Sequence, residues 1–195
     1  MENIEDTRAR ILTAAEQRFR QWGYTKTTMA DIAGDCHMSA ANLYRYFQNK
    51  QDIAAAFACQ CLNEEETLLK SIVADNTLSA GERLQSFVLE TLHHTYRKHE
   101  ENPRINELVE TVCQKRQDIV EHHVNTKLRL LGELLVRGME SGEFDSLDAE
   151  STAEAILSAI TLFDVPFFMH LYPLSQFERK AQGVVELILR AVKKR

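Results

Sequence analysis

The sequence predicts an all-α protein, with a head of three short helices in residues 1–50 and a larger helical domain in residues 51–195. Two observations carry this prediction. The 195 residues include only seven Gly and three Pro, so few positions interrupt a helix. Apolar residues recur three and four positions apart through most of the chain, which is the spacing of one helical face.

The first predicted helix begins near Asp6 or Thr7, because either side chain can accept a hydrogen bond from an amide of the first turn. Gly23 is predicted to end this helix, since glycine adopts the left-handed conformation at little steric cost. The face expected to be buried carries Ile11, Leu12, Ala15, Phe19 and Trp22.

The next two helices are predicted to be joined by a tight turn. Thr28 with Asp31 forms a variant of the capping box and begins one helix. Ser39 is a fresh cap for the next, so the earlier helix must stop near Cys36. Only residues 37–38 remain for the turn, and two short helices joined in this way form a helix-turn-helix.

The second helix of this pair carries side chains suited to DNA. Leu43 and Phe47 are predicted to face inward, with Tyr46 at the boundary. Small, hydrogen-bonding and cationic side chains on the outer positions suit entry into a major groove. The same apolar positions would also serve any three small helices, so periodicity alone leaves DNA binding open. The candidate DNA-binding residues are Thr28, Ser39, Ala40, Ala41, Asn42, Tyr44, Arg45 and Lys50; Tyr44 and Lys50 are candidates for phosphate, and Asn42 and Arg45 for base edges or for solvent.

Residues 11–50 resemble the N-terminal domain of the tetracycline-repressor (TetR) family. That family typically has Gly in the turn, where His37 stands here, but His tolerates a positive φ better than most residues. Ala30 offers only a methyl group where family members place a long polar side chain. The matching segments are Ile11-Leu12-Thr13-Ala14-Ala15, Trp22-Gly23-Tyr24, Thr27-Thr28, Ile32-Ala33, Ser39 and Leu43-Tyr44-Arg45-Tyr46-Phe47-Gln48-Asn49-Lys50.

Charge is divided unequally along the chain. Residues 1–50 hold seven Lys/Arg and six Asp/Glu, a balance of +1, and residues 51–195 hold sixteen and twenty-three, a balance of −7. The acidic excess therefore lies outside the head. A balance of +1 is too weak to coat nucleic acid through bulk charge. We expect DNA affinity to come from a few placed contacts, doubled by dimerisation.

Further helices are expected along residues 51–195. Asn49 with Asp52 begins the first, and Ser79 with Glu82 begins another. Pro166 is expected to kink the penultimate helix, because proline removes a hydrogen bond and clashes one turn back. The predicted helices cover about 50–75, 79–101, a short stretch through Ile105–Val112, 117–141, a stretch from Asp148 through Phe163, and 174–193.

The two C-terminal helices are rich in Ala, Ile, Leu and Val over residues 151–163 and 181–192, with Gly183 as a point of close approach. The TetR resemblance implies that these helices pair with their copies in a homodimer. Packing within the chain's own core is the alternative explanation of the same pattern.

The segment 163–172 is dense in aromatic residues and is broken by proline. Together with side chains from other helices it could line an apolar ligand cavity with a few orienting polar groups, and plain core packing is the alternative. The candidate ligand-binding residues are Phe87, Tyr96, Cys113, Phe163, Phe167, Phe168 and His170.

Signatures of catalysis and of metal binding are missing from the sequence. It has no Gly-rich phosphate loop, nucleophile elbow, His-Glu-x-x-His or Cys-x-x-Cys pair. The adjacent pairs His93-His94 and His122-His123 diverge by about 100° on a helix and cannot chelate together. The run Glu64-Glu65-Glu66 is expected to be solvated, and Cys36, Cys59, Cys61 and Cys113 are expected to be buried reduced thiols.

These observations predict a DNA-binding transcriptional regulator. We expect a homodimeric repressor, released from a near-palindromic double-stranded DNA operator by a small apolar molecule, with no catalytic residue, metal or cofactor. A helical dimeric protein-interaction module without DNA binding is the alternative. No run of eighteen apolar residues occurs and the first residues are acidic, so we expect no membrane span and a cytoplasmic location.

Overall fold

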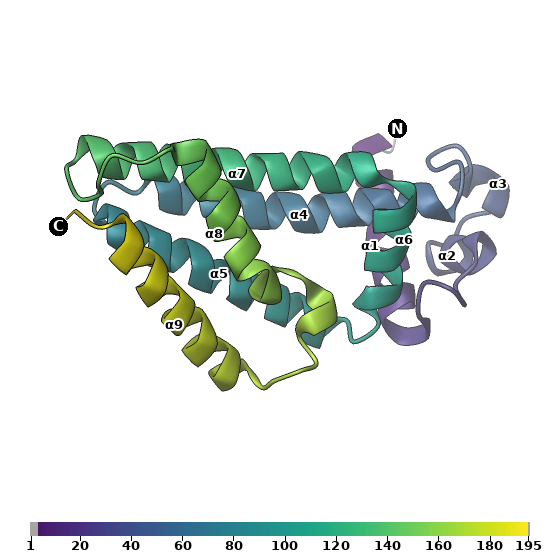
Figure 1. Cartoon of the computed structure of the whole chain (residues 1–195). Helices are drawn as coiled ribbons and strands as arrows, with labels where there is room; N and C mark the ends of the chain where they lie inside the picture. Colours follow the sequence, from purple (N-terminus) through teal and green to yellow (C-terminus); the bar gives the residue numbers. More distant parts are fainter. Residues whose placement is uncertain (1–3, 195) are drawn as a thin grey trace. The chain divides into compact units, whose positions relative to one another are not determined.

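The structure is a computed structural model that describes residues 4–194, and Figure 1 follows the chain by colour from α1 to α9. The described residues are mainly helical, as predicted, and the only strand-like pairing among them is one bridge between Phe144 and Lys193. The elements are α1 (Ile4–Trp22), α2 (Met29–Asp35), α3 (Ala40–Leu43), α4 (Lys50–Ala74), α5 (Ala80–Glu101), α6 (Ile105–Lys115), α7 (Gln117–Glu140), α8 (Ala149–Asp164), the 3-10 helix η1 (Pro166–Phe168) and α9 (Leu174–Val192).

The chain divides into two compact units, each with its own apolar core. The first unit runs through Leu62 and also includes His99–Val120. The second unit comprises Asn63–Lys98 and the chain from Glu121 onward. The divisions therefore fall inside α4, α5 and α7. The functional boundary at residue 50 stays a prediction.

The predicted start of the first helix near Asp6 or Thr7 is wrong, because α1 already includes Ile4. The other predicted helix starts with a capping side chain are confirmed by their hydrogen bonds. The Thr28 hydroxyl oxygen accepts from the Asp31 amide at 3.2 Å, and the Asp31 carboxylate accepts from the Thr28 amide at 2.9 Å. Such side chains satisfy amides that have no partner within the helix. The other predicted caps bond to the amide three residues on: Ser39 to Asn42, Asn49 to Asp52, Ser79 to Glu82 and Asp148 to Ser151.

Two positions with positive φ shape the head. Gly23 has φ 84° where α1 ends, as predicted. His37 has φ 55° in the turn between α2 and α3, and it is the only non-glycine residue with positive φ in the described range. The turn that glycine commonly serves in the TetR family is therefore built here with histidine.

Two expectations about helix ends and faces are wrong. Trp22 was expected in the core, but 49% of its surface is exposed, because α1 ends at this residue. Pro166 does not kink α8; the helix ends at Asp164, and Val165 is extended with φ −109° and ψ 119°. A residue that precedes proline is pushed out of the helical region by steric contact with the proline ring.

Candidate DNA-reading and effector sites

The segment that begins with α3 exposes the side chains predicted for DNA. Leu43 and Phe47 are buried and Tyr46 is half-buried, so the inward face is confirmed. Tyr44 keeps 51% of its surface exposed, and Arg45 is exposed beside it. The remaining candidates are also accessible: Thr28, Ser39 and Ala41 are exposed, and Ala40 and Asn42 are half-buried.

Lys50 is engaged within its own unit. Its ammonium donates to the carbonyl oxygens of Tyr24 at 2.7 Å and Thr27 at 2.8 Å, with Thr25 at 3.4 Å. The same ammonium lies 4.2 Å from the centroid of the Tyr24 ring, and partial burial lowers its pKa. An ammonium has three protons, so these carbonyls can take all of its donors. The geometry gives Lys50 a part in fixing residues 24–27, and its predicted phosphate contact stays untested.

Three arginines of α1 also point into the first unit. Arg8 donates to the Tyr46 carbonyl at 2.6 Å, and Arg10 donates to the Cys36 carbonyl at 3.3 Å. Arg18 forms two hydrogen bonds with the Asp35 carboxylate, and these bonds raise the pKa of Arg18 and lower that of Asp35. Much of the positive charge of the head therefore holds the helix-turn-helix together.

Only some of the residues predicted to line a ligand cavity meet in the second unit. Phe163 and Tyr96 meet Phe177 edge-on, with ring centroids 6.4 Å and 6.2 Å apart. The fully buried Phe87 belongs to the same apolar core, but Phe177, on α9, was not among the predicted residues.

Of the other residues predicted to bind the ligand, Phe168 is half-buried against the apolar core of the second unit, and the rest lie at the surface or in the other unit. Phe167 keeps 56% of its surface exposed and packs against Phe168 and His170, with ring centroids 5.6 Å and 5.8 Å away. Cys113 is exposed on α6 and belongs to the first unit, whereas the aromatic residues belong to the second.

The cysteine expectation holds only in part. All four cysteines are free thiols, but only Cys36 is buried, while Cys59 and Cys61 are half-buried and Cys113 is exposed. Burial raises the pKa of the Cys36 thiol, which keeps that group protonated.

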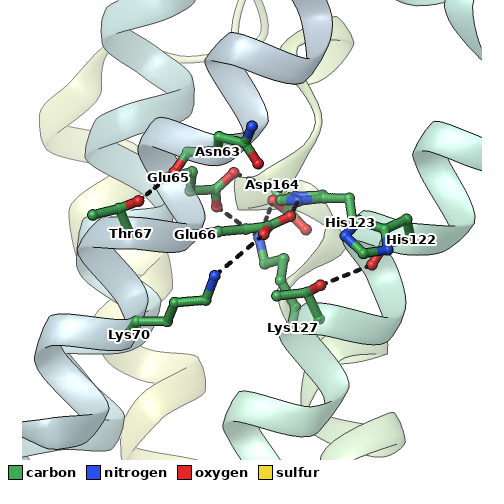
Figure 2. A network of polar contacts seen from close by, with 10 residues as sticks. Asn63, Glu65, Glu66, Thr67, Lys70, His122, His123, Lys127 and Asp164 are labelled. Carbon is green, nitrogen blue, oxygen red and sulfur yellow. Dashed lines mark hydrogen bonds and ion pairs between the residues drawn. The ribbon is translucent and has the colours of Figure 1, made fainter.

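A buried network of charged side chains was missed by the sequence analysis. The expectation that Glu64-Glu65-Glu66 is solvated is wrong for Glu65 and Glu66, which are both buried. Figure 2 shows them, on α4, meeting His123 and Lys127 from α7 and Asp164 from α8. Adjacent residues on a helix can both be buried when the neighbouring helix offers each of them a partner of opposite charge.

Charges alternate along this network. The His123 ring lies 2.9 Å from a Glu66 oxygen through Nδ1 and 3.4 Å from a Glu65 oxygen through Nε2. The Lys127 ammonium contacts Glu65 at 2.7 Å and Asp164 at 2.5 Å. Lys70 approaches Glu66 to 3.7 Å at the accessible end. The order is thus Lys70, Glu66, His123, Glu65, Lys127, Asp164, and it is electrically neutral when His123 is protonated.

The pKa values follow from this arrangement. Burial alone would raise the pKa of Glu65, but Lys127 and His123 outweigh burial and lower it to about 2. Burial opposes the charged form of His123, yet its hydrogen bond and attraction to Glu65 raise its pKa. Burial likewise opposes the ammonium of Lys127, and Asp164 and Glu65 raise its pKa.

Three of these residues have donor atoms at distances that could suit a metal ion. One ligand atom each from Glu65, His123 and Asp164 lies within 4.8 Å of the others. The Lys127 ammonium contacts both carboxylates, however, and so already supplies a positive charge at this place. The group is therefore explained as an internal ion network.

Sequence comparison decides the family. The family description "Tetracyclin repressor-like, C-terminal domain" matches residues 80–185, and "Bacterial regulatory proteins, tetR family" matches residues 11–57. The chain belongs to the TetR family. It is a DNA-binding transcriptional regulator, and the second match covers the helix-turn-helix described above.

The relatives of this TetR-family chain are also described as transcriptional regulators. The HTH-type transcriptional regulator TtgR of Pseudomonas putida is 25% identical over 170 residues, which cover 82% of this chain and 79% of TtgR. Among solved structures, SmeT in complex with triclosan aligns with TM-score 0.71 at 19% identity, over 97% of this chain and 92% of SmeT. SmeT is described as the repressor of a Stenotrophomonas maltophilia multidrug efflux pump.

A second solved structure supports the same fold. FadR of Bacillus subtilis, in complex with stearoyl-CoA, aligns with TM-score 0.68 at 19% identity, over 93% of this chain and 97% of FadR. These relatives are regulators, and they do not favour a module without DNA binding. Among the described residues, none of the helices combines the length and apolar character needed to cross a bilayer.

Proposed function

We propose that this TetR-family regulator is a cytoplasmic, homodimeric repressor that leaves a near-palindromic operator when a largely apolar molecule binds its second unit. The observation that carries the DNA part is that Tyr44 and Arg45 are exposed, and Asn42 is half-buried, on a segment whose Leu43 and Phe47 are anchored in the core. Two such heads related by a twofold axis would enter successive major grooves. The effector must bind the DNA-released state more tightly than the DNA-bound state.

Selection of binding sites from random duplex DNA tests which side chains recognise the base sequence of the operator. The parent protein should select a near-palindrome. Asn42→Ala or Arg45→Ala should relax one symmetric position of each half-site, because a base-edge contact discriminates by about 1–3 kcal/mol. Tyr44→Ala should weaken binding to all sites alike, as expected for a phosphate contact. Selection of the parental sequence by both Asn42 and Arg45 variants would place specificity in other residues.

The outer faces of α8 and α9 support the proposed dimer. Ala155, Ala159 and Gly183 are exposed, and Leu187 keeps 66% of its surface exposed. A Cβ atom added at Gly183 would meet nothing within 4 Å in this chain. Gly183→Arg should therefore leave the monomer folded and disturb only a partner packed at this position.

Sedimentation velocity tests the dimer with two substitutions. Gly183→Arg or Ala159→Arg should give a helical monomer with weak operator binding, because burying an unpaired charge in an interface is costly. The exposed Gln182→Arg change on α9 adds the same single charge to a neighbouring position that points about 100° away from Gly183, and it is the comparison for the added charge alone. A dimer that persists in both variants would move the interface away from α8 and α9.

Two relatives support an effector with a large apolar part, since SmeT was solved with triclosan and FadR with stearoyl-CoA. In this chain the aromatic residues around Phe177 and the exposed Phe167 are the two places to test. A screen for compounds that raise the melting temperature and release operator DNA would supply the ligand. Phe163→Ala and Phe167→Ala should weaken its effect more than they weaken DNA binding without it. An equal response of parent and both variants would place the effector site elsewhere.

A further inference from the structure

The recognition segment is too short to hold its own position. Helix α3 comprises only Ala40–Leu43. Isolated helices of this length do not form in water, because nucleation fixes several residues before hydrogen bonds repay it. The Ser39 cap supports the beginning of the segment. Its far end, where the chain leaves α3 toward α4, needs support from another element.

Arg8 of α1 provides contacts at that end. Its Nη1 donates to the carbonyl oxygen of Tyr46 at 2.6 Å. Its guanidinium carbon lies 4.2 Å from the centroid of the Phe47 ring. A cation next to carbonyls at the end of a helical segment is favourable, and a guanidinium over an aromatic face adds further attraction. One side chain thus holds the backbone of Tyr46 and the ring of Phe47 together.

The residues that Arg8 holds adjoin those proposed to meet DNA. Tyr44 and Arg45 directly precede Tyr46, and the Tyr46 amide donates to the Leu43 carbonyl at 3.0 Å. Phe47 is itself buried in the first unit's core. Because Tyr46 is bonded directly to Arg45, movement of the Tyr46 carbonyl displaces the adjacent backbone and changes the direction in which the side chains of Tyr44 and Arg45 point.

We propose that Arg8 is a positioning residue for operator recognition: it acts through Tyr46 and Phe47 and makes no contact with phosphate itself. This role differs from the one that a cation near DNA ordinarily has. A cation that meets a phosphate displaces condensed counterions, so its removal reduces the dependence of affinity on salt. When a cation that orients the recognition segment is removed, the affinity for DNA falls but its dependence on salt stays unchanged.

The salt dependence of operator binding separates the two roles. The affinity of the full-length protein for its selected operator duplex is measured over a range of salt concentrations, at a temperature where circular dichroism shows each variant folded. Arg8→Met should lower the affinity about tenfold or more, since a charged hydrogen bond contributes about 1.5–3 kcal/mol. The slope of log affinity against log salt should stay at the parental value.

Arg45→Met is the matched comparison, because Arg45 is an exposed cation on the recognition segment itself. Loss of an electrostatic DNA contact there should reduce the salt slope by about 1 per head. The same reduction in Arg8→Met would overturn the proposal, and so would an unchanged affinity in that variant.

A double-mutant cycle provides an independent measurement. Phe47→Leu keeps an apolar side chain in the core but removes the ring beneath the guanidinium. If Arg8 acts through Phe47, the loss of affinity in the double variant is smaller than the product of the two single losses. Multiplicative losses contradict the proposal. If Arg8→Met does not fold, Arg8→Lys, which keeps a donor of similar reach but no planar group, replaces it in the cycle and in the salt titration.

Discussion

Two cations of the first unit and two of the second meet different kinds of partner. In the first unit, Arg8 and Lys50 donate to neutral backbone carbonyls. In the second unit, His123 and Lys127 meet carboxylates in the interior. A carbonyl contact fixes a segment of backbone and leaves no second charge behind when the cation is removed. A buried ion pair makes each charge depend on its partner, so its disruption should have the larger effect.

Lys127→Met should have the largest effect on stability. The substitution leaves the carboxylates of Glu65 and Asp164 without the ammonium that now lies between them. Loss of one partner of a buried pair typically destabilises a protein by about 3–5 kcal/mol. Denaturant unfolding measures this loss, and Lys70→Met, whose side chain is 51% exposed, serves as the control. Equal stability of the two variants would contradict the difference drawn between the units.

The charge of His123 should make stability depend on pH. Its pKa is raised in the folded state, so its contribution is fully present below the unfolded pKa of about 6.5. The contribution disappears as the pH rises through the folded-state pKa, at about 1.4 kcal/mol for each unit by which the pKa is raised. Melting temperatures of the parent and His123→Gln should therefore converge with rising pH.

His122→Gln is the matched control for this titration, because His122 is the exposed neighbour on the same helix. The variant shows what the same substitution does at an exposed position of the same helix. A His123 pKa at or below the ordinary value, measured by NMR in the full-length protein, would show that the imidazolium is not stabilised by Glu65 and Glu66.

Lys50→Met should have an intermediate effect. The variant loses the hydrogen bonds to Tyr24 and Thr27 but buries no unpaired charge. We expect a loss of about 1–2 kcal/mol in unfolding free energy. The salt slope of operator binding should be unchanged. A slope reduced by about 1 per head would instead establish the phosphate contact that the sequence predicts.

Arg18→Gln should have the smallest effect, because Arg18 and Asp35 form a pair near the surface. Exposed pairs contribute little to stability, because water and salt screen them. Unfolding in low and in high salt measures the contribution, and the difference from the parent should vanish in high salt. A difference that survives high salt would mean that this pair behaves like the buried network.

Local signals predicted the head well. The caps at Thr28 and Ser39, the end at Gly23 and the inward Leu43 depend on residues within a few positions of each other, and all are confirmed. The positive φ at His37 agrees with the resemblance, since the TetR family commonly has glycine at this place in the turn. Helix ends and caps that depend only on nearby residues can therefore be predicted from the sequence alone.

Contacts between residues far apart in the chain could not be predicted from such local signals. Glu65 lies 62 positions from Lys127, and nothing in a run of three glutamates shows which of them face a lysine on another helix. The only available signal was the spacing of His123 and Lys127, which places both on one face of α7. Phe177 was missed for a similar reason, because its aromatic partners come from other elements.

The four residues of α3 limit how much sequence one head can recognise. With Asn42 and Arg45 as its base-reading side chains, a head gains about 2–6 kcal/mol of discrimination, at about 1–3 kcal/mol for each contact. A genome offers on the order of 10⁶ or more competing sites, and outcompeting them takes about 8 kcal/mol. One head alone cannot find its target among so many alternatives. In the proposed homodimer two heads would read together, and the deformability of the intervening base pairs would supply further information.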